Sequence, residues 1–245
     1  MPRRVRLDAE LVARGFFSTT DEAMRAIMAG EVSTSDRRLT SPGEQVHPGI
    51  ELHVRGRKAY ASRGGLKLER GLKALGVDPV GLDCVDIGCS TGGFTDCLLK
   101  HGAHHVLAVD VGRAQFDWAL RQDPRVTLLE QTNIVDVPDD PRHAGAYQLA
   151  VCDVSFTSVI TILPAVVRLL GAGGTFLTLV KPQFEAPREQ VGEGGIVRDE
   201  SVRRQALDHV AQAMEDAGFE LGGSCESPIT GHKGNVEYLL VGRLA

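Results

Sequence analysis

The chain has 245 residues, 42% hydrophobic and 24% charged, values that exclude a disordered or fibrous protein and suit one medium α/β domain with a smaller one. No apolar run approaches the roughly 20 residues that cross a bilayer, and the first residues do not form a secretory signal, so we expect a cytoplasmic protein without a membrane partner. The net charge of −5 hides an asymmetry: residues 1–73 hold 14 Lys and Arg against 9 Asp and Glu, the remainder 13 against 23, and a basic small module indicates contact with a polyanion.

Three segments are expected along the chain. Residues 1–55 form a small α+β domain, residues 56–62 an interdomain linker, and residues 63–245 a larger domain. In the first domain, one amphipathic helix ends at Gly15, and a second, preceded by capping residues, ends at Gly30. Short strands follow within residues 32–54 and predict a small antiparallel patch.

The spacing of several residues in this first domain is characteristic: Arg6-Leu7-Asp8, Ser18, Thr19, Ala23, Ile27, Gly30, Pro42-Gly43 and Val54-Arg55. The pattern resembles the alpha-L RNA-binding module of a small-subunit ribosomal protein and of several RNA-modifying enzymes. The resemblance implies RNA contact through basic side chains, for which the candidates are Arg3, Arg4, Arg6, Arg14, Arg25, Arg55, Arg57, Lys58 and Arg63. The alternative is a domain that only stabilises the enzyme.

Strands and helices alternate through the larger domain. Helices are expected at 64–76, 92–101, 114–121, 158–170 and 200–217, and strands at 84–88, 105–110, 126–130, 147–153, 174–181, 219–226 and 236–243. Alternation of this kind predicts a mostly parallel, doubly wound sheet of the Rossmann-like class. The closing antiparallel strand favours the methyltransferase variant over the dehydrogenase variant.

A glycine-rich turn follows the first strand of this domain, at residues 86–94. Glycine permits positive φ and close approach of a ligand, and the helix after the turn presents unpaired N–H groups. The next strand ends at Asp110, where α/β nucleotide folds bind ribose hydroxyls. The turn has neither a phosphate-binding loop with its lysine nor the Gly-x-Gly-x-x-Gly spacing, so it favours a nucleoside without phosphates, S-adenosylmethionine above all.

The candidate cofactor-binding residues are Asp86, Gly88, Cys89, Ser90, Thr91, Gly92, Gly93, Phe94, Asp110, Asn133 and Asp153. The carboxamide of Asn133 suits an adenine edge, although an asparagine that closes a turn is about as common. No base accompanies Cys89, so a catalytic thiol is not expected. The five cysteines have no Cys-x-x-Cys or histidine spacing typical of zinc sites, and no metal is expected.

Lys181 ends an almost wholly apolar strand and precedes a proline that turns the chain outward. A partly buried lysine beside other charges is suited to act as a base or to hold an alkoxide oxygen. Asp153, at the end of the neighbouring strand, is the natural countercharge.

Six motifs identify a family: Ser62 to Leu68, Asp86 to Phe94, Asp110-Val111-Gly112, Asp153 to Phe156, Val180 to Glu185 and Gly231 to Glu237. With them the chain resembles the FtsJ-like RNA ribose 2′-O-methyltransferases, and with the amino-terminal module it resembles the hemolysin A (TlyA) family of ribosomal RNA methyltransferases. The resemblance implies methyl transfer from S-adenosylmethionine to the 2′-hydroxyl of a cytidine in 16S or 23S ribosomal RNA. It also implies a catalytic tetrad, which maps onto Lys67, Asp153, Lys181 and Glu237.

Three alternatives remain open at this stage. One is an RNA-binding protein with haemolysin-like activity, against which the complete tetrad counts; another is a base-specific RNA methyltransferase; a third is a methyltransferase for a small molecule. The glycine-rich loops 190–196 and 231–237 are expected to be mobile and to close over the substrate. The oligomeric state cannot be predicted from these residues.

Overall fold

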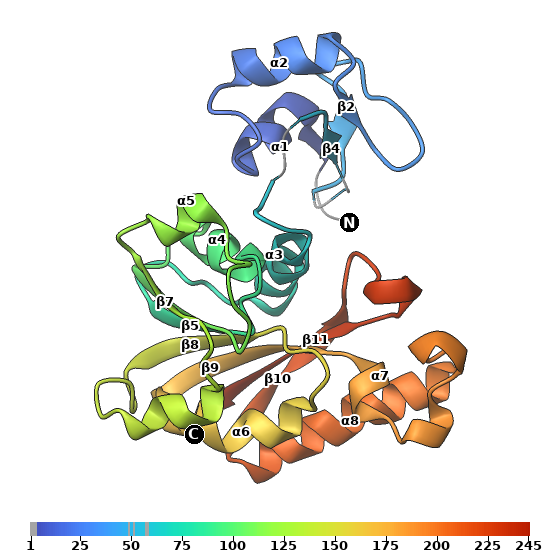
Figure 1. Ribbon diagram of the computed structural model, residues 1–245. Helices are drawn as coiled ribbons and strands as arrows, with labels where there is room; N and C mark the ends of the chain where they lie inside the picture. Colours follow the sequence, from blue (N-terminus) through green and yellow to red (C-terminus); the bar gives the residue numbers. More distant parts are fainter. Residues whose placement is uncertain (1–3, 49, 51, 57–58) are drawn as a thin grey trace. The chain divides into compact units, whose positions relative to one another are not determined.

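The computed structural model describes residues 4–48, 50, 52–56 and 59–245. The chain divides into two compact units, Met1–Ser62 and Arg63–Ala245 (Figure 1). The second unit begins at the residue where the sequence places the start of the larger domain. Each unit has its own buried core, so each is described by itself.

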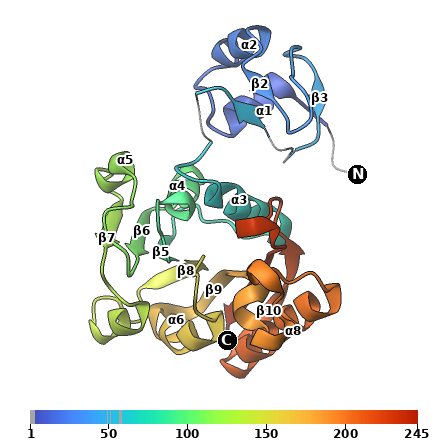
Figure 2. The same ribbon diagram turned by 45° about the vertical axis from the view of Figure 1, so that its right-hand side comes forward.

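The described residues of the first unit form two helices, α1 (Leu7–Ala13) and α2 (Thr20–Met28), and four two-residue strands (Figure 2). The Thr19 side chain accepts a hydrogen bond from the Glu22 N–H and caps α2, as expected from the sequence. The expected antiparallel pairing within residues 32–54 is confirmed for β2 (Val32–Ser33) and β4 (His53–Val54). β3 (Gln45–Val46) pairs instead with β1 (Val5–Arg6), in a separate antiparallel ladder. Leu7, Leu11, Ile27 and Leu39 are fully buried between these elements.

The second unit is built on a seven-stranded sheet of order β10-β11-β9-β8-β5-β6-β7. The strands are β5 (Asp83–Ile87), β6 (His105–Val109), β7 (Val126–Leu129), β8 (Tyr147–Cys152), β9 (Leu170–Val180), β10 (Phe219–Glu226) and β11 (Tyr238–Leu244). β5 to β9 pair in parallel, whereas β11 runs antiparallel to both of its neighbours. The predicted Rossmann-like methyltransferase architecture is therefore confirmed.

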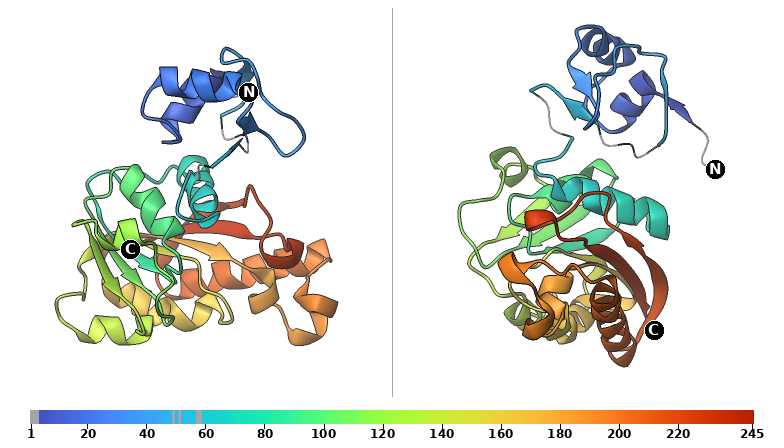
Figure 3. Two further views of the ribbon diagram at one scale, coloured as in Figure 1. Left: turned by 45° about the horizontal axis from the view of Figure 1, so that its top comes forward. Right: turned by 90° about the vertical axis from the view of Figure 1, so that its right-hand side faces the viewer.

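Helices cover both faces of this sheet (Figures 1 and 3). They are α3 (Gly64–Leu75), α4 (Gly93–Lys100), α5 (Trp118–Arg121), α6 (Leu163–Leu169), α7 (Pro182–Glu185) and α8 (Glu200–Asp216). Strand side chains such as Ile87, Val109 and Phe176 are almost fully buried, as a parallel sheet covered on both faces requires. β5 lies between β6 and β8. The chain therefore continues from β5 to one side of the sheet through β6 and β7, and then returns to the other side of β5 at β8. Open α/β sheets bind ligands in the crevice at such a reversal of strand order.

Two expected helices are shorter than predicted. The segment 158–170 is divided into a 3₁₀ turn (Val159–Ile162), which the Ser158 hydroxyl caps through the Ile160 N–H, and α6, which has a proline in its first turn. The segment 114–121 is helical only as α5, where the Asp117 carboxylate accepts from the N–H groups of Ala119 and Leu120. The second correction comes from a capping side chain inside the expected helix.

Candidate active site

Backbone strain marks one edge of the sheet. Among the described residues, five that are not glycine have positive φ, and each lies in a loop at the carboxyl ends of β5 to β8 or just before β11: Ser90, Ala114, Gln131, Phe156 and Lys233. Such conformations cost of order 1–3 kcal/mol each and persist where the surroundings hold them, often at functional sites. This is also the edge at which open α/β sheets bind ligands.

The glycine turn after β5 is closely packed on two sides. Gly88 has φ +80°, and a Cβ there would lie 3.1 Å from the Asp153 carbonyl oxygen. Gly92 has φ +91°, and its Cβ would lie 2.6 Å from a methyl carbon of Leu120. Both positions therefore need glycine for conformation and for space. Because α4 begins at Gly93, the N–H groups of its first turn are directed toward the turn.

Asp110 ties the turn to the loop after β6. Its carboxylate accepts hydrogen bonds from the Ser90 N–H at 2.8 Å and from the Gly112 N–H at 2.6 Å. The sequence predicted a ribose contact for this side chain, and the structure adds a second role, which is to hold two loops together. The half-buried carboxylate remains at the end of β6.

Asp86 is fully buried beneath the turn. One carboxylate oxygen accepts from the Thr95 hydroxyl at 2.6 Å, while Oδ1 has no hydrogen-bond partner in the described part of the chain. Burial raises the pKa of Asp86 to about 7, with a further contribution from the charges of Asp153 and Asp110. A buried carboxyl group with one free oxygen thus underlies the predicted cofactor site.

The other predicted cofactor residues are either buried in the core or hydrogen-bonded within the neighbouring loops. Burial, followed by the charge of Asp86, raises the pKa of the Cys89 thiol far above its ordinary value, so the thiol is not a nucleophile. Phe94 is 3% exposed and packs in the core. Thr91 contributes its carbonyl to the Asp117 N–H at 3.3 Å. Asn133 is exposed, and its Oδ1 accepts from the Val135 N–H at 3.3 Å, the turn-closing role.

Two ion pairs form at the same edge. Lys181 Nζ lies 2.5 Å from Asp153 Oδ1 and donates to the Ser155 hydroxyl at 2.8 Å, and the lysine is only 7% exposed. Lys67 Nζ lies 2.5 Å from Glu237 Oε2, and both of these residues are buried. The four predicted tetrad residues are thus arranged as two lysine–carboxylate pairs.

Sheet register and helix packing bring these pairs to one place. β11 pairs Tyr238 with Val180 of β9, so Glu237 and Lys181 follow in register at the end of the ladder. Lys67 belongs to α3, and four residues later Gly71 lies so close to the sheet that a Cβ would be 2.8 Å from a Leu239 methyl carbon. This close approach of α3 to β11 lets Lys67 reach Glu237.

The loop after β8 holds residues that the sequence analysis did not assign to the site. Phe156 has φ +67° and is 92% exposed, and its ring lies 5.4 Å from the Phe184 ring, centroid to centroid. Glu185 accepts from the Ser158 hydroxyl at 2.5 Å and from the Val159 N–H at 2.9 Å, which fixes the loop. A large aromatic residue in the loop that follows the end of a parallel strand is the signal that could have indicated Phe156.

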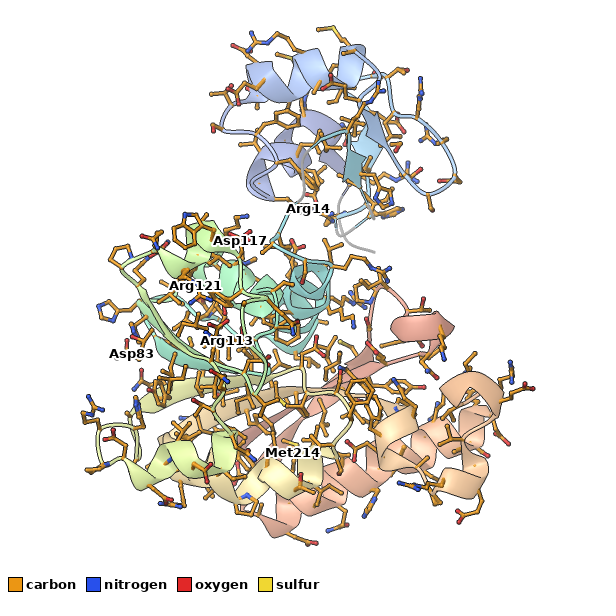
Figure 4. All side chains as sticks on the ribbon, viewed as in Figure 1. Arg14, Asp83, Arg113, Asp117, Arg121 and Met214 are labelled. Carbon is orange, nitrogen blue, oxygen red and sulfur yellow. The ribbon has the colours of Figure 1, made fainter. Side chains whose placement is uncertain are left out.

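The predicted RNA-binding arginines differ in their surroundings. Arg14 is 5% exposed; it donates to Glu10 at 2.9 Å and to the Ile50 carbonyl at 2.7 Å (Figure 4). Its assignment as an RNA contact is therefore wrong, because the guanidinium is used inside the first unit. Arg6 is paired with Asp8 yet keeps 55% of its side chain exposed. Exposed members of the predicted set are Arg4, Arg6, Arg25, Arg55 and Arg63.

Arg63 belongs to the second unit, where it donates to the Thr230 carbonyl at 2.8 Å. Arg3, Arg57 and Lys58 lie outside the described residues. Within the described part of the chain, no group of three or more His, Cys, Asp and Glu side chains could hold a metal ion. The search of the same residues for a helix both long and apolar enough to span a membrane also finds none.

Comparison with known proteins shows which proteins this chain resembles. The family described as FtsJ-like methyltransferase matches residues 60–244. The 16S/23S rRNA (cytidine-2′-O)-methyltransferase TlyA of Mycobacterium tuberculosis is 41% identical over 242 residues, covering 98% of this chain and 90% of the relative.

Solved structures show the same likeness. A structure from Streptococcus thermophilus, described as that of a candidate hemolysin, is 42% identical with a TM-score of 0.73, covering all of this chain and 90% of that one. An S-adenosylmethionine-dependent methyltransferase from Aquifex aeolicus shares the fold alone, at 17% identity and a TM-score of 0.53, over 76% of this chain and 95% of the other.

Proposed function

The chain belongs to the FtsJ-like methyltransferase family, and on that premise we propose that it methylates the ribose 2′-hydroxyl of a cytidine in ribosomal RNA. The observation that carries the proposal is the pair of buried ion pairs, Lys181 with Asp153 and Lys67 with Glu237, beside the glycine turn. The likeness to TlyA supports the cytidine and the ribosomal substrate. The proposed place of action is the cytoplasm, where ribosomal subunits are.

The residues around the turn fit S-adenosylmethionine. Glycine at positions 88 and 92 allows the positive φ on which the shape of the turn depends, and no lysine is present in the turn to bind a phosphate. Asp86, Asp110 and Asp153 make the surroundings acidic, which suits a cationic sulfonium and ribose hydroxyls and opposes a phosphorylated ligand. When bound, the cofactor supplies an electrophilic methyl group.

Lys181 is proposed to lie nearest the reacting 2′-hydroxyl. A ribose hydroxyl is a weak acid, so its attack needs a cation or a base at the oxygen. The Asp153 carboxylate and the Ser155 hydroxyl hold the Lys181 amine in one place, where it can orient the oxygen and stabilise the charge that develops. The Lys67–Glu237 pair is proposed to position the ribose, because alignment for in-line attack supplies much of the acceleration.

Phe156 supports an RNA substrate over a small molecule. Phe156 contacts the Phe184 ring yet stays 92% exposed in a strained backbone conformation, and unstacked RNA bases are commonly held on exposed aromatic faces. Base–aromatic stacking contributes about 1–3 kcal/mol per base. We propose that Phe156 stacks on the base of the target nucleotide while Lys181 holds its ribose.

The first unit is proposed to bind RNA through its exposed arginines, among them Arg4, Arg6 and Arg25. Arginine side chains that neutralise phosphates supply affinity that falls with salt concentration. The proposed partner is therefore ribosomal RNA or a ribosomal subunit. This role is independent of the chemistry, so the two can be tested separately.

The test is to incubate the protein with labelled S-adenosylmethionine and ribosomal subunits that lack the modification, and to map the labelled nucleotide. We expect label on a cytidine 2′-oxygen, and its loss in a Lys181→Met variant that still binds RNA and cofactor. Lys73→Met, which changes an exposed lysine on α3, is the matched control and should keep full activity.

Three outcomes would reject the proposal. Label on a base would show base methylation, and label on a small molecule alone would show a different acceptor. Leakage from liposomes at physiological salt with no label on RNA would favour a lytic protein.

A further inference from the structure

Two glycine-rich loops, residues 192–197 and residues 231–237, are joined by hydrogen bonds. The first follows α7 in the chain and the second leads into β11. Lys233, an exposed residue of the second loop, donates to the Gly194 carbonyl of the first loop at 3.1 Å. Loops that the sequence predicted to be mobile thus hold one another in this structure.

Asn235 makes the central connection. It is 3% exposed, its Nδ2 donates to the Gly195 carbonyl at 2.8 Å, and its Oδ1 accepts from the Val197 N–H at 3.0 Å. Its own carbonyl accepts from the Gly231 N–H at 2.8 Å and so closes the second loop. One buried side chain therefore uses both its donor and its acceptor to bind the first loop, while its backbone shapes the second.

The second loop in turn lies against Glu237 of the tetrad. A Cβ on Gly231 would lie 1.9 Å from Glu237 Oε1, so the loop backbone directly limits where this carboxylate can be. The Glu237 carbonyl also accepts from the Ser227 N–H at 2.9 Å, which fixes its backbone. Glu237 is 2% exposed and pairs with Lys67.

We propose that Asn235 is a positioning residue for Glu237: by clamping the two loops it holds Gly231 against the carboxylate and so keeps the Lys67–Glu237 pair aligned. The inference rests on the proposed function, in which that pair positions the ribose. Loss of a hydrogen-bonding side chain at a buried site lets the surrounding groups move, and small displacements at a reacting centre reduce the rate strongly. The clamp acts on the acceptor half of the site, through the Lys67–Glu237 pair.

The experiment compares Asn235→Ala with the wild-type protein on ribosomal subunits. We expect kcat to fall at least tenfold, while KM for S-adenosylmethionine and its calorimetric affinity stay within twofold. In a Glu237→Gln background the same substitution should cost less than twofold, because the group that Asn235 positions has already been changed. Gly231→Ala, which displaces the same carboxylate, should likewise lose kcat and show no additive loss with Asn235→Ala.

Asp199→Ala is the control for simple destabilisation, since it removes the cap of α8 just beyond the first loop without touching the clamp. It should lower the melting temperature and leave kcat unchanged. A wild-type kcat in Asn235→Ala, or an equal multiplicative loss in the Glu237→Gln background, would overturn the inference. A wild-type protein that leaves ribosomal RNA unmethylated would instead reject the proposed function.

Discussion

Gly88 lies against the backbone of Asp153, the residue whose carboxylate forms the 2.5 Å pair with Lys181. Gly88 belongs to the turn proposed to bind the cofactor, and Asp153 to the pair proposed to hold the ribose. The two halves of the site are therefore in direct contact through one aspartate. A substitution in the glycine turn should therefore also disturb the Lys181–Asp153 pair.

The first prediction follows from that contact. Gly88→Ala places a Cβ 3.1 Å from the Asp153 carbonyl oxygen at φ +80°, so we expect weaker S-adenosylmethionine binding and a kcat/KM lowered by about 10-fold or more, as about 1.4 kcal/mol corresponds to tenfold. Titration calorimetry and initial rates measure the two effects. Gly81→Ala is the control, because Gly81 has φ +73° and no atom within 4 Å of its Cβ position. Equal effects of the two substitutions would show that strain alone is responsible.

The second prediction concerns the dependence of stability on pH. Burial raises the pKa of Asp86 from 3.8 to about 7, so between these pH values the folded state binds a proton that the unfolded state has lost. The contribution of this group to the free energy of unfolding is thus greatest at low pH and falls, by up to about 4 kcal/mol, as pH rises to about 7. Asp86→Asn should remove the fall.

This dependence is measured by urea unfolding of the wild-type protein and the Asn variant, without cofactor, from pH 5 to pH 8. The stability of Asp86→Asn relative to the wild type should increase across that range. A difference that stays constant with pH would contradict the raised pKa. Asp78→Asn changes an aspartate in an exposed position and should show no such trend.

The third prediction tests the exposed ring of Phe156. Phe156→Ala should lower kcat/KM for the ribosomal substrate by roughly 5-fold to 150-fold, the equivalent of the 1–3 kcal/mol of a stacked base, with unchanged cofactor affinity. Phe156→Trp should retain most of the activity, because it keeps an aromatic face. Initial rates at subsaturating RNA report the effect. Val80→Ala removes another exposed apolar side chain and should be neutral; full activity of Phe156→Ala would exclude stacking.

The fourth prediction separates two arginines of the first unit. Arg14→Met removes the buried ion pair with Glu10 and the hydrogen bond to the Ile50 carbonyl, and breaking a buried pair costs about 3–5 kcal/mol, so the unit should unfold more readily. Arg25→Met changes an exposed side chain, so it should leave stability unchanged and reduce RNA affinity. The slope of log affinity against log salt concentration should fall by about 1, the value for one lost phosphate contact. Thermal unfolding and RNA binding at several salt concentrations distinguish these outcomes. The reverse pattern would contradict both assignments.

Much of the fold could be predicted because it follows from local patterns. Alternation of apolar strands with amphipathic helices predicted the parallel sheet, and the antiparallel last strand was expected from the closing pair. The carboxyl ends of parallel strands meet at one edge, so Asp110, Asp153 and Lys181 could be expected to lie near the glycine turn. Helix ends were less predictable, since a capping side chain such as Asp117 decides them.

The sequence by itself determined the fold class and the residue types available at the site, because periodicity and strand ends are properties of neighbouring residues. Only the tertiary structure decided which charges pair: Lys67 and Glu237 are 170 positions apart and meet through the packing of α3 on β11. It also decided that Arg14 points inward and that Phe156 stays exposed. These relationships depend on the register of nonadjacent strands and on the space left by glycines such as Gly71, neither of which a local pattern contains.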